Sequence, residues 1–393
     1  MKAGWEEVRL GKIADVQSGG TPLVADKQLW DGGIPWYSSG ELNDVYTTDP
    51  ERTVSTIGLE KSNAKLFPAG SLLLGMYDTA ALKMSILDRA AAFNQAIAGI
   101  KPNDQINIRF VFYALNSKKE ELLERRRGVR QKNLSLGKVR DFEIPAPPLP
   151  EQQRIVTLLD EAFDGIATAK ANAEKNLQNA RAIFESHLQL VFTKRGDGWQ
   201  DKTLEQISTT FGRGKSRHRP RNEPKLYGGK YPFIQTGDIR NAGHFITEFS
   251  QTYSESGLAQ SKLWPKGTIC ITIAANIAET GILGFDACFP DSVIGVVPNP
   301  AEAEIGFVEY LLQSFKVRIQ ALGQGSAQAN INMGTFENER FPFPGVAEQR
   351  QIVAKLDNLN AETQRFESVY QQKLAALDEL KKSLLHQAFS GNL

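Results

Sequence analysis

The chain has 393 residues, of which 41% are hydrophobic, so it can form two or more packed domains and is too apolar for wholesale disorder. It contains 46 Lys and Arg against 45 Asp and Glu, a formal net charge of +1, which excludes a generally basic, histone-like protein and restricts any nucleic-acid surface to local patches. The two cysteines match no disulfide framework or metal-ligand spacing, and no apolar run approaches the ~20 residues that span a bilayer. Residues 1–7 lack a signal-peptide core, so we expect a cytoplasmic protein.

The chain repeats its own sequence once. Residues 151–156 (EQQRIV) recur as residues 348–353 (EQRQIV), and the same offset of 197 residues pairs 66–70 (LFPAG) with 263–267 (LWPKG). A constant offset over most of the chain indicates two copies of one structural unit rather than a chance likeness between loops.

Each copy begins with a mixed α+β region. Residues 71–74 and 268–273 are apolar runs that follow Pro-x-Gly turns and are typical of strands, whereas residues 110–115 and 307–312 are typical of helix starts. Each region ends in a proline-rich joint. Since proline stops a strand and suits the first turn of a following helix, the joint predicts the start of a helix. The predicted boundaries give a first domain, a central helix, a second domain and a C-terminal helix at residues 1–147, 148–195, 196–344 and 345–393.

The two helical segments follow a 3.5-residue repeat. Core positions step by four and three from Ile155 to Ile183, and the second segment keeps the register from Ile352 to Leu380. If the helices pack antiparallel, small residues of the first meet large residues of the second, which fills a core without voids. The predicted pairs are Ala162 with Leu377, Ala169 with Tyr370, Ala173 with Phe366, and Ala180 with Leu359. The alternative is that each helix lies separately on its own domain.

We therefore expect an α+β protein with two repeated globular α/β domains, separated by two long antiparallel helices and related by a pseudo-two-fold axis. A helix over residues 151–192 would be roughly 60 Å long at ~1.5 Å per residue. Two similar domains at a fixed separation would suit a ligand that repeats along an axis, as double-stranded DNA does.

The duplicated order of these features resembles type I restriction-modification specificity subunits. The resemblance comes from the proline-rich joints, the motifs at residues 151–156 and 348–353 with their helices, and the similar openings at residues 4–13 and 198–207. It implies that each globular domain is a target recognition domain that reads one half of a split DNA sequence, while the helices set the spacing and dock methyltransferase subunits. It also implies two methyltransferase and two restriction (translocase-nuclease) partners. S-adenosylmethionine, ATP and magnesium would belong to those partners, with no cofactor, metal or chemistry in this chain.

Lysine and arginine bind DNA phosphates, arginine can read guanine, and Gln or Asn can read adenine. We therefore chose basic and polar side chains as candidate DNA-binding residues, and they form three groups. The first group follows a predicted helix end and has two counterparts in the second copy: Arg125, Arg126, Arg127, Arg130, Gln131, Lys132 and Asn133, with Gln328 and Asn330. The second is a basic loop of the second copy: Arg213, Lys215, Arg217 and Arg219. The third comprises two polar turns after strand-like runs: Tyr37, Ser38 and Ser39, and Gln235 and Thr236.

Each group also has a purely structural explanation. The first could be a solvated helix end with a turn, the second a flexible solvated loop, and the third a plain turn. Tyr77, Asp78 and Asn276 follow the repeated strands and are weaker candidates.

The sequence contains no catalytic motif that we can recognise. Residues 212–216 include Gly-Lys-Ser, but Thr209 stands where a phosphate-binding loop needs its first glycine. Asn299-Pro300 does not continue as a methyltransferase motif, and the four histidines show no metal-ligand spacing. Two other functions stay open: a coiled-coil scaffold that presents two protein-binding domains, and an enzyme that acts alone.

Overall fold

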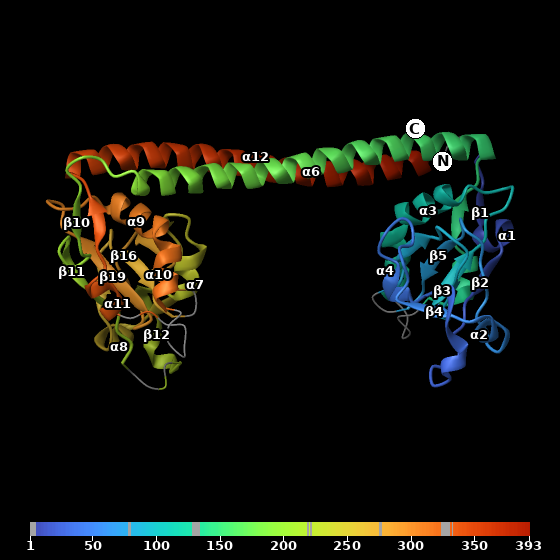
Figure 1. Cartoon of the computed structure of the whole chain (residues 1–393), viewed down its shortest axis with the longest axis horizontal. Helices are drawn as coiled ribbons and strands as arrows, with labels where there is room; N and C mark the ends of the chain where they lie inside the picture. The colour runs from blue at the N-terminus through green and yellow to red at the C-terminus, as the bar shows by residue number, and fades with distance from the viewer. Residues whose placement is uncertain are drawn as a thin grey trace. The chain divides into compact units, whose positions relative to one another are not determined.

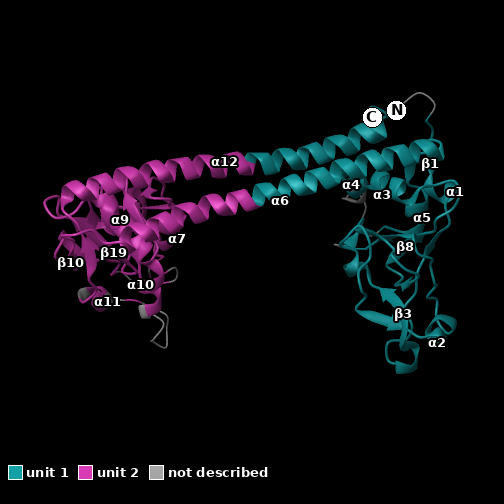
Figure 2. Cartoon of the chain, turned by 45° about the horizontal axis from the view of Figure 1, so that its top comes forward, with its two compact units in different colours: residues 1–174, 372–393 teal, residues 175–371 magenta. Residues whose placement is uncertain are grey.

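The computed structural model describes residues 5–77, 80–127, 134–217, 220, 222–274, 277–323, 331 and 333–393. The chain divides into two compact units, with residues 1–174 and 372–393 in unit 1 and residues 175–371 in unit 2 (Figure 2). Each unit contains a mixed α+β domain and a segment of each of two long helices, α6 (Leu149–Thr193) and α12 (Val346–Ser390). The expected fold class of two repeated α+β domains with two long helices is confirmed.

Unit 1 is built from small sheets covered by short helices (Figure 1). Its four-stranded sheet has the order β2 (Val16–Ser18), β8 (Ile97–Ile100), β5 (Leu72–Gly75) and β6 (Met84–Ile86). Its other strands are β4 (Arg52–Val54), β3 (Trp30–Tyr37) and β7 (Ala92–Phe93) in one sheet, and β1 (Glu7–Arg9) paired with β9 (Glu143–Pro145). Its helices are α1 (Leu10–Ile13), η1 (Lys27–Leu29), η2 (Ser39–Glu41), α2 (Thr56–Glu60), α3 (Ile108–Ser117), α4 (Lys119–Arg127) and α5 (Leu136–Arg140).

Unit 2 repeats this arrangement. Its main sheet has the order β11 (Ser208–Arg213), β19 (Val293–Pro298), β16 (Ile269–Thr272), β17 (Thr280–Leu283) and β13 (Phe245–Ile246). Its other strands are β14 (Gln251–Tyr253), β12 (Tyr227–Phe233), β18 (Ala287–Cys288) and β15 (Leu263–Trp264) in one sheet, and β10 (Gln200–Lys202) paired with β20 (Phe341–Phe343). Its helices are η4 (Pro224–Leu226), α7 (Thr236–Asn241), α8 (Glu255–Ala259), α9 (Ile305–Ser314), α10 (Lys316–Gly323) and α11 (Met333–Glu337).

The central strands of the two units share details of packing. Gly99 in β8 and Gly295 in β19 occupy equivalent positions beside the buried strands β5 and β16. A Cβ on Gly99 would lie 2.3 Å from Cζ of Phe93, and a Cβ on Gly295 would lie 2.7 Å from Cζ of Phe289. The sequence repeat is therefore a repeat of packing, in which an aromatic ring fills the space above a glycine.

A buried glutamine explains the motif that recurs after each proline-rich joint. Gln152 is 3% exposed; its Oε1 accepts the backbone N–H of Asn107 and its Nε2 donates to the carbonyl of Pro147, each at 2.8 Å. Gln349 is fully buried and makes the same two bonds at the same distances in unit 2. Because a buried amide without partners would be costly, each glutamine fixes the start of a long helix to its own domain.

A tyrosine–aspartate hydrogen bond ties the domain helix of each unit to a long helix. Tyr113 of α3 donates to Asp160 of α6 at 2.5 Å, and Tyr310 of α9 donates to Asp357 of α12 at 2.8 Å. Burial, together with the neighbouring carboxylate, raises the pKa of Tyr113 to about 12 and also raises the pKa of Tyr310. Both hydroxyls therefore remain protonated donors at neutral pH.

The segments of α6 and α12 that belong to unit 1 pack antiparallel. Arg154 Nη2 donates to the backbone carbonyl of Leu393 at 3.0 Å, and farther along α6 the Nζ of Lys170 lies 2.8 Å from Oδ1 of Asp378. Residue numbers rise along α6 as those of the partners fall along α12, which is the antiparallel direction.

The segments of α6 and α12 that belong to unit 2 also pack antiparallel. Arg181 of α6 lies 3.1 Å from Glu367 of α12, and just beyond the end of α6 the indole of Trp199 donates to Glu348 at 3.0 Å. Antiparallel packing of the helices is thus observed within each unit.

The predicted register between the helices is wrong, and two predicted pairs do not form: Ala162 with Leu377, and Ala180 with Leu359. In unit 1 the ring of Phe163, next to Ala162, lies 5.1 Å from the Nζ of Lys381. In unit 2 the neighbour of Ala180 is Arg181, which pairs with Glu367. The observed register therefore differs from the predicted one by roughly two turns of helix at 3.6 residues per turn.

The inward-facing stripe of α12 also departs from a strict 3.5-residue repeat. After the buried Thr363, the next inward positions are Glu367, Tyr370 and Leu374, whereas Phe366, predicted to lie in the core, is 54% exposed. One step of four residues in place of three moves the stripe around the helix and changes its partners. The remaining predicted packing residues are buried or half-buried: Ala173 and Ala180, and Ala162, Ala169, Leu359, Tyr370 and Leu377.

Candidate nucleic-acid interface

Gly214 follows β11 in a turn that only glycine can occupy. A Cβ at this position would lie 2.3 Å from the carbonyl oxygen of Phe289. The backbone N–H of Lys215, the next residue, donates to the same carbonyl at 3.1 Å. The turn therefore determines where the side chains of Arg213 and Lys215 leave the backbone.

Gly19 makes the same turn in unit 1. A Cβ on Gly19 would lie 2.0 Å from the carbonyl oxygen of Phe93, and the N–H of Gly20 donates to that carbonyl at 2.9 Å. Ser18 and Gly20 thus occupy the positions that Arg213 and Lys215 occupy in unit 2. We call this element the glycine turn of each unit. The two turns have the same backbone arrangement, but their side chains differ in charge.

A lysine packs beside the glycine turn of unit 2. Ser261 Oγ donates to the carbonyl of Lys215 at 2.8 Å, and the Nζ of the next residue, Lys262, lies 3.6 Å from the ring centroid of the buried Trp264. Burial, and then the charge of Lys215, lowers the pKa of Lys262. Within the described ranges neither lysine has an acidic partner, so this site carries positive charge that an anion would neutralise.

The predicted arginines of this loop are exposed where the structure describes them. Arg213 Nε donates to the backbone carbonyl of Asp291 at 2.7 Å, which orients the guanidinium without cancelling its charge. Arg217 is also exposed. Arg219 lies outside the described residues.

Unit 1 has a polar hollow of about 530 Å³ at its glycine turn, and Lys65 is the one cationic side chain among the described residues that line it. Thr21 Oγ1 donates to Gln95 Oε1 at 2.5 Å, and the Nζ of Lys65 donates to Gln17 Oε1 at 2.9 Å. The hollow is lined by the turn and by neighbouring polar residues: Ser18, Gly19, Gly20, Thr21, Asn63, Lys65 and Gln95.

Lys65 and Lys262 were missed in the sequence analysis. They directly precede the repeated segments 66–70 and 263–267, so their shared position was visible as part of the 197-residue repeat. What the sequence did not show is that this segment lies beside the glycine turn, more than forty residues earlier in the chain.

Tyr37 is not available for DNA contact, which corrects one prediction. It is 1% exposed and its hydroxyl donates to the carbonyl of Thr48 at 2.6 Å, while burial raises its pKa. Its ring belongs to a buried cluster with Phe67 and Phe93. The consecutive residues Trp36 and Tyr37 are both buried, so the end of β3 is covered on both faces and neither side chain reaches the surface.

The other predicted polar residues of these turns start short helices. Ser38 and Gln235 each form a capping box with the acid three residues later, in which Glu41 and Asp238 accept the N–H of Ser38 at 2.7 Å and of Gln235 at 2.8 Å. Ser39 and Thr236 follow them and are half-buried. These turns therefore have a structural role as helix starts.

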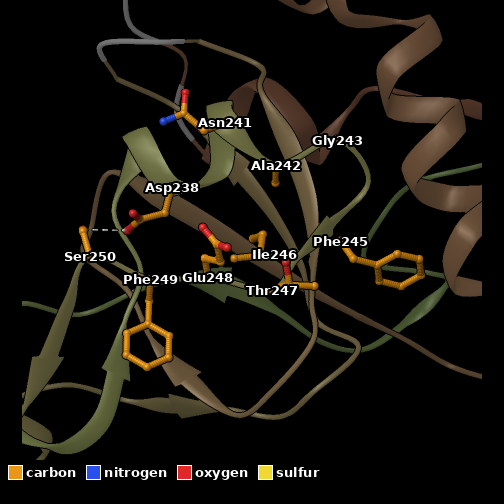
Figure 3. Close-up of a pocket in the computed structure, with 10 residues that line it drawn as sticks. All are labelled: Asp238, Asn241, Ala242, Gly243, Phe245, Ile246, Thr247, Glu248, Phe249 and Ser250. Atoms are coloured by element: carbon orange, nitrogen blue, oxygen red, sulfur yellow. Dashed lines mark hydrogen bonds between the residues drawn. The ribbon is translucent and has the colours of Figure 1, made fainter. Parts of the chain in front are cut away.

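A second hollow, of about 400 Å³, lies beside α7 in unit 2 (Figure 3). Ser250 Oγ donates to Oδ2 of Asp238 at 3.2 Å within it, and Glu248 and the 44%-exposed Phe249 also line it. Carboxylates accept hydrogen bonds from cytosine, and exposed rings can stack on bases. None of these lining residues was among the sequence candidates.

Metal-binding groups and membrane-spanning helices were sought in all described residues. The described residues contain no group of three or more His, Cys, Asp or Glu side chains that could hold a metal ion. In the same part of the chain, no helix combines the length and the apolar character that crossing a membrane requires.

The family comparison covers most of the chain. Residues 2–178 and 196–375 match the type I restriction modification DNA specificity domain, once for each repeat. The chain belongs to this family. The duplication found in the sequence is therefore a duplication of the specificity domain.

Relatives of this specificity-domain chain include named subunits of restriction enzymes. The chain is 22% identical over 444 residues to the type I restriction enzyme EcoBI specificity subunit of Escherichia coli, covering 99% of this chain and 86% of that one. It is 25% identical over 197 residues to the Escherichia coli EcoR124I/EcoR124II specificity subunit, where the match covers only 47% of each chain. The match to the Methanocaldococcus jannaschii MjaIX specificity subunit likewise covers 62% of that protein.

A solved structure shares the fold of the specificity-domain chain over its full length. It is described as the structural basis underlying complex assembly and conformational transition of the type I R-M system. The TM-score is 0.83 at 18% identity, and the match covers 100% of this chain and 99% of that one. At this identity the likeness establishes the fold.

Several candidate residues of this family member lie outside the described residues. They are Arg130, Gln131, Lys132, Asn133, Gln328 and Asn330, and the weaker candidates Asp78 and Asn276. The same holds for the side chains of Arg125, Arg126 and Arg127. Their role in DNA contact stays a prediction.

Proposed function

We propose that the chain is the DNA sequence-specificity subunit of a type I restriction-modification complex. Each α+β domain would read one half of a bipartite, asymmetric DNA target, and the long helices would set the spacing between the halves. A subunit of this kind works on DNA in the cytoplasm.

The observation that supports this proposal best is the glycine turn, whose backbone is the same in both units while its side chains differ. Gly19 and Gly214 hold equivalent turns, yet Ser18 and Gly20 in unit 1 are replaced by Arg213 and Lys215 in unit 2. A shared scaffold that carries different polar and charged groups would position each domain on the DNA backbone in its own way, while other side chains of each domain would distinguish the bases of its half-site.

The long helices have the exposed apolar residues that a protein partner could cover. Exposed apolar side chains that adjoin one another on a surface favour a protein interface, and Phe366 and Val369 lie three residues apart on α12, where they are neighbours on the helix surface. The large exposed apolar residues on the two helices are Leu149, Leu158, Ile183 and Leu190 of α6, and Phe366, Val369 and Leu380 of α12. We propose that two methyltransferase subunits dock on these helices, and that two restriction subunits join the assembly.

We further propose that the chain has no chemistry of its own. S-adenosylmethionine, ATP and magnesium would be bound by the partner subunits, so modification or cleavage would require the assembled complex. Incubating the purified chain alone with DNA, these cofactors and magnesium tests this, since any modification or cleavage would identify an enzyme.

A domain-duplication experiment tests the reading of half-sites. The full chain is co-expressed with its methyltransferase subunits and the methylated sites are mapped by sequencing. In a matched variant, residues 196–344 are replaced by a second copy of residues 1–147. We expect the natural complex to methylate a split asymmetric site and the variant to methylate an inverted repeat of one half with similar spacing. A scaffold that never touches DNA would give no sequence preference in either case.

A further inference from the structure

We propose that Lys65 in unit 1 and Lys262 in unit 2 are equivalent DNA-phosphate contacts, and that Arg213 and Lys215 extend this contact in unit 2 only. This inference rests on the proposed function and adds the place where each domain holds the DNA backbone. It also predicts that the two half-sites differ in how strongly salt weakens their binding.

The equivalence of the two lysines rests on the scaffold beside them. Each lysine precedes a Leu-aromatic-Pro sequence, and the aromatic residue packs on the ring that adjoins the glycine turn. Phe67 lies 4.7 Å from Phe93 between ring centroids, and Trp264 lies 5.0 Å from Phe289. The carbonyls of these same partners, Phe93 and Phe289, accept the N–H after each turn glycine. The backbones of Lys65 and Lys262 therefore occupy equivalent positions beside the glycine turns of their units.

The surroundings of the two lysines differ in charge. Lys65 donates to the amide oxygen of Gln17, whose Nε2 donates in turn to the carboxylate of Asp15 at 2.8 Å. Unit 2 has Gly212 at the position of Gln17, so Lys262 lacks this tether and lies instead above the Trp264 ring. Its nearest charged influence is Lys215, a second cation.

Like charges held together without an acid are costly unless an anion sits between them. Among the described residues, Arg213 is oriented by a backbone carbonyl, and neither Lys215 nor Lys262 forms an ion pair. A DNA phosphate would supply the negative charge that these cations lack, and its oxygens can also accept hydrogen bonds from backbone N–H groups. In unit 1 the polar hollow of about 530 Å³ offers hydroxyls and amides around one lysine, which suits a single phosphate.

The test is the salt dependence of DNA binding by the assembled complex, measured on its mapped target by titration at several salt concentrations. Each phosphate contact contributes about 0.9 to the slope of log affinity against log salt. Lys262→Gln and Lys65→Gln should each reduce the slope by about 0.9. The triple variant Arg213→Gln, Lys215→Gln, Lys262→Gln should reduce it by about three times as much. The penalty for a mismatched base pair should stay unchanged, because phosphate contacts carry no base information.

Two matched variants exclude other causes. Lys194→Gln removes a charge at the exposed end of α6 in the same unit and should leave the slope unchanged. Lys262→Arg keeps the charge above Trp264 and should keep the natural slope. If Lys262→Arg behaves like Lys262→Gln, or Lys194→Gln lowers the slope equally, the effect is packing or bulk charge and the inference is wrong.

The outcome also separates this inference from the proposed function. If the natural complex discriminates its target but Lys65→Gln and Lys262→Gln leave the slope of log affinity against log salt unchanged, only the phosphate assignment fails. If substitution of either lysine changes base preference with no change in slope, the residue reads bases and the assignment also fails. If the natural complex shows no sequence preference at all, the proposed function itself fails.

Discussion

The two units attach a domain helix to a long helix, α3 to α6 in unit 1 and α9 to α12 in unit 2, with different groups around one conserved hydrogen bond. Both use a tyrosine that donates to an aspartate, Tyr113 to Asp160 and Tyr310 to Asp357. Unit 1 adds Arg109, whose Nη2 lies 2.6 Å from Asp160.

Unit 2 supports the same junction with a buried pair. Nδ1 of His244 lies 2.6 Å from Oε2 of Glu309, and the imidazole stacks on Tyr310 with centroids 4.5 Å apart. Thr280 donates to the other oxygen of Glu309, a side chain that is fully buried. Unit 1 has Phe112 at the position of Glu309, one residue before its tyrosine. The comparison teaches that the repeat preserves the anchoring bond while the groups around it are free to change from apolar to ionic.

The largest expected effect comes from breaking the buried pair. Glu309→Ala should lower the free energy of unfolding of unit 2 by about 3–5 kcal/mol, because it leaves buried donors without an acceptor. Hydrogen exchange of peptides from unit 2 measures the loss, and peptides from unit 1 serve as the internal control. Val45 is the counterpart of His244, because its carbonyl accepts the N–H of Ile86 as the carbonyl of His244 accepts the N–H of Ile282. The double variant Glu309→Phe, His244→Val, which imitates unit 1, should recover much of the lost stability. Equal protection in Glu309→Ala and the natural chain would show that the pair is unimportant.

The buried and exposed sides of α12 should respond very differently to truncation. Leu356 is fully buried, so Leu356→Ala should cost roughly 2–5 kcal/mol of unfolding free energy. Phe366 is 54% exposed, so Phe366→Ala should change stability by less than about 0.5 kcal/mol. Denaturant unfolding of both variants measures the contrast. A large loss in Phe366→Ala would restore the predicted register and contradict the observed one.

Unit 2 should lose stability as pH rises above neutrality, whereas the junction of unit 1 should not respond. Burial acts to lower the pKa of His244, but the hydrogen bond and charge of Glu309 outweigh it and raise the pKa above its ordinary value. A raised folded-state pKa stabilises fully below the unfolded value of about 6.5 and loses that contribution as pH passes through the folded value. Exchange rates corrected for pH in the two units measure the difference, and Glu309→Gln should remove it. Parallel pH profiles in both units would contradict this assignment.

The smallest expected effect is that of the ion pair between the helices in unit 2. A double-mutant cycle on Arg181 and Glu367, 3.1 Å apart, should give a coupling of about 0.2–1 kcal/mol, as for other surface pairs. The same cycle on Arg181 and Glu362, which is five residues before Glu367 on α12, should give no coupling. Coupling to Glu362 in place of Glu367 would mean that the register is shifted.

Much of the architecture was accessible from the sequence because it depends on local patterns. Repeated motifs, proline-rich joints and apolar periodicity predicted the duplication and both long helices, α6 and α12. The candidate site was less accessible. Arg213 and Lys215 were found as a basic run, but Lys262 was not, since the packing of a distant segment brings it to the glycine turn.

The amino-acid order alone determined the two-fold repeat, the helix lengths and the family likeness, because each arises from spacing along one stretch of chain. Packing decided the rest. One step of four residues in the stripe of α12 turned Phe366 outward, and contacts between side chains of the two helices, such as Arg181 with Glu367, decided the register. The burial of Tyr37 and the meeting of His244 with Glu309 join residues far apart in the chain, and only the way side chains fill a shared core can decide such contacts.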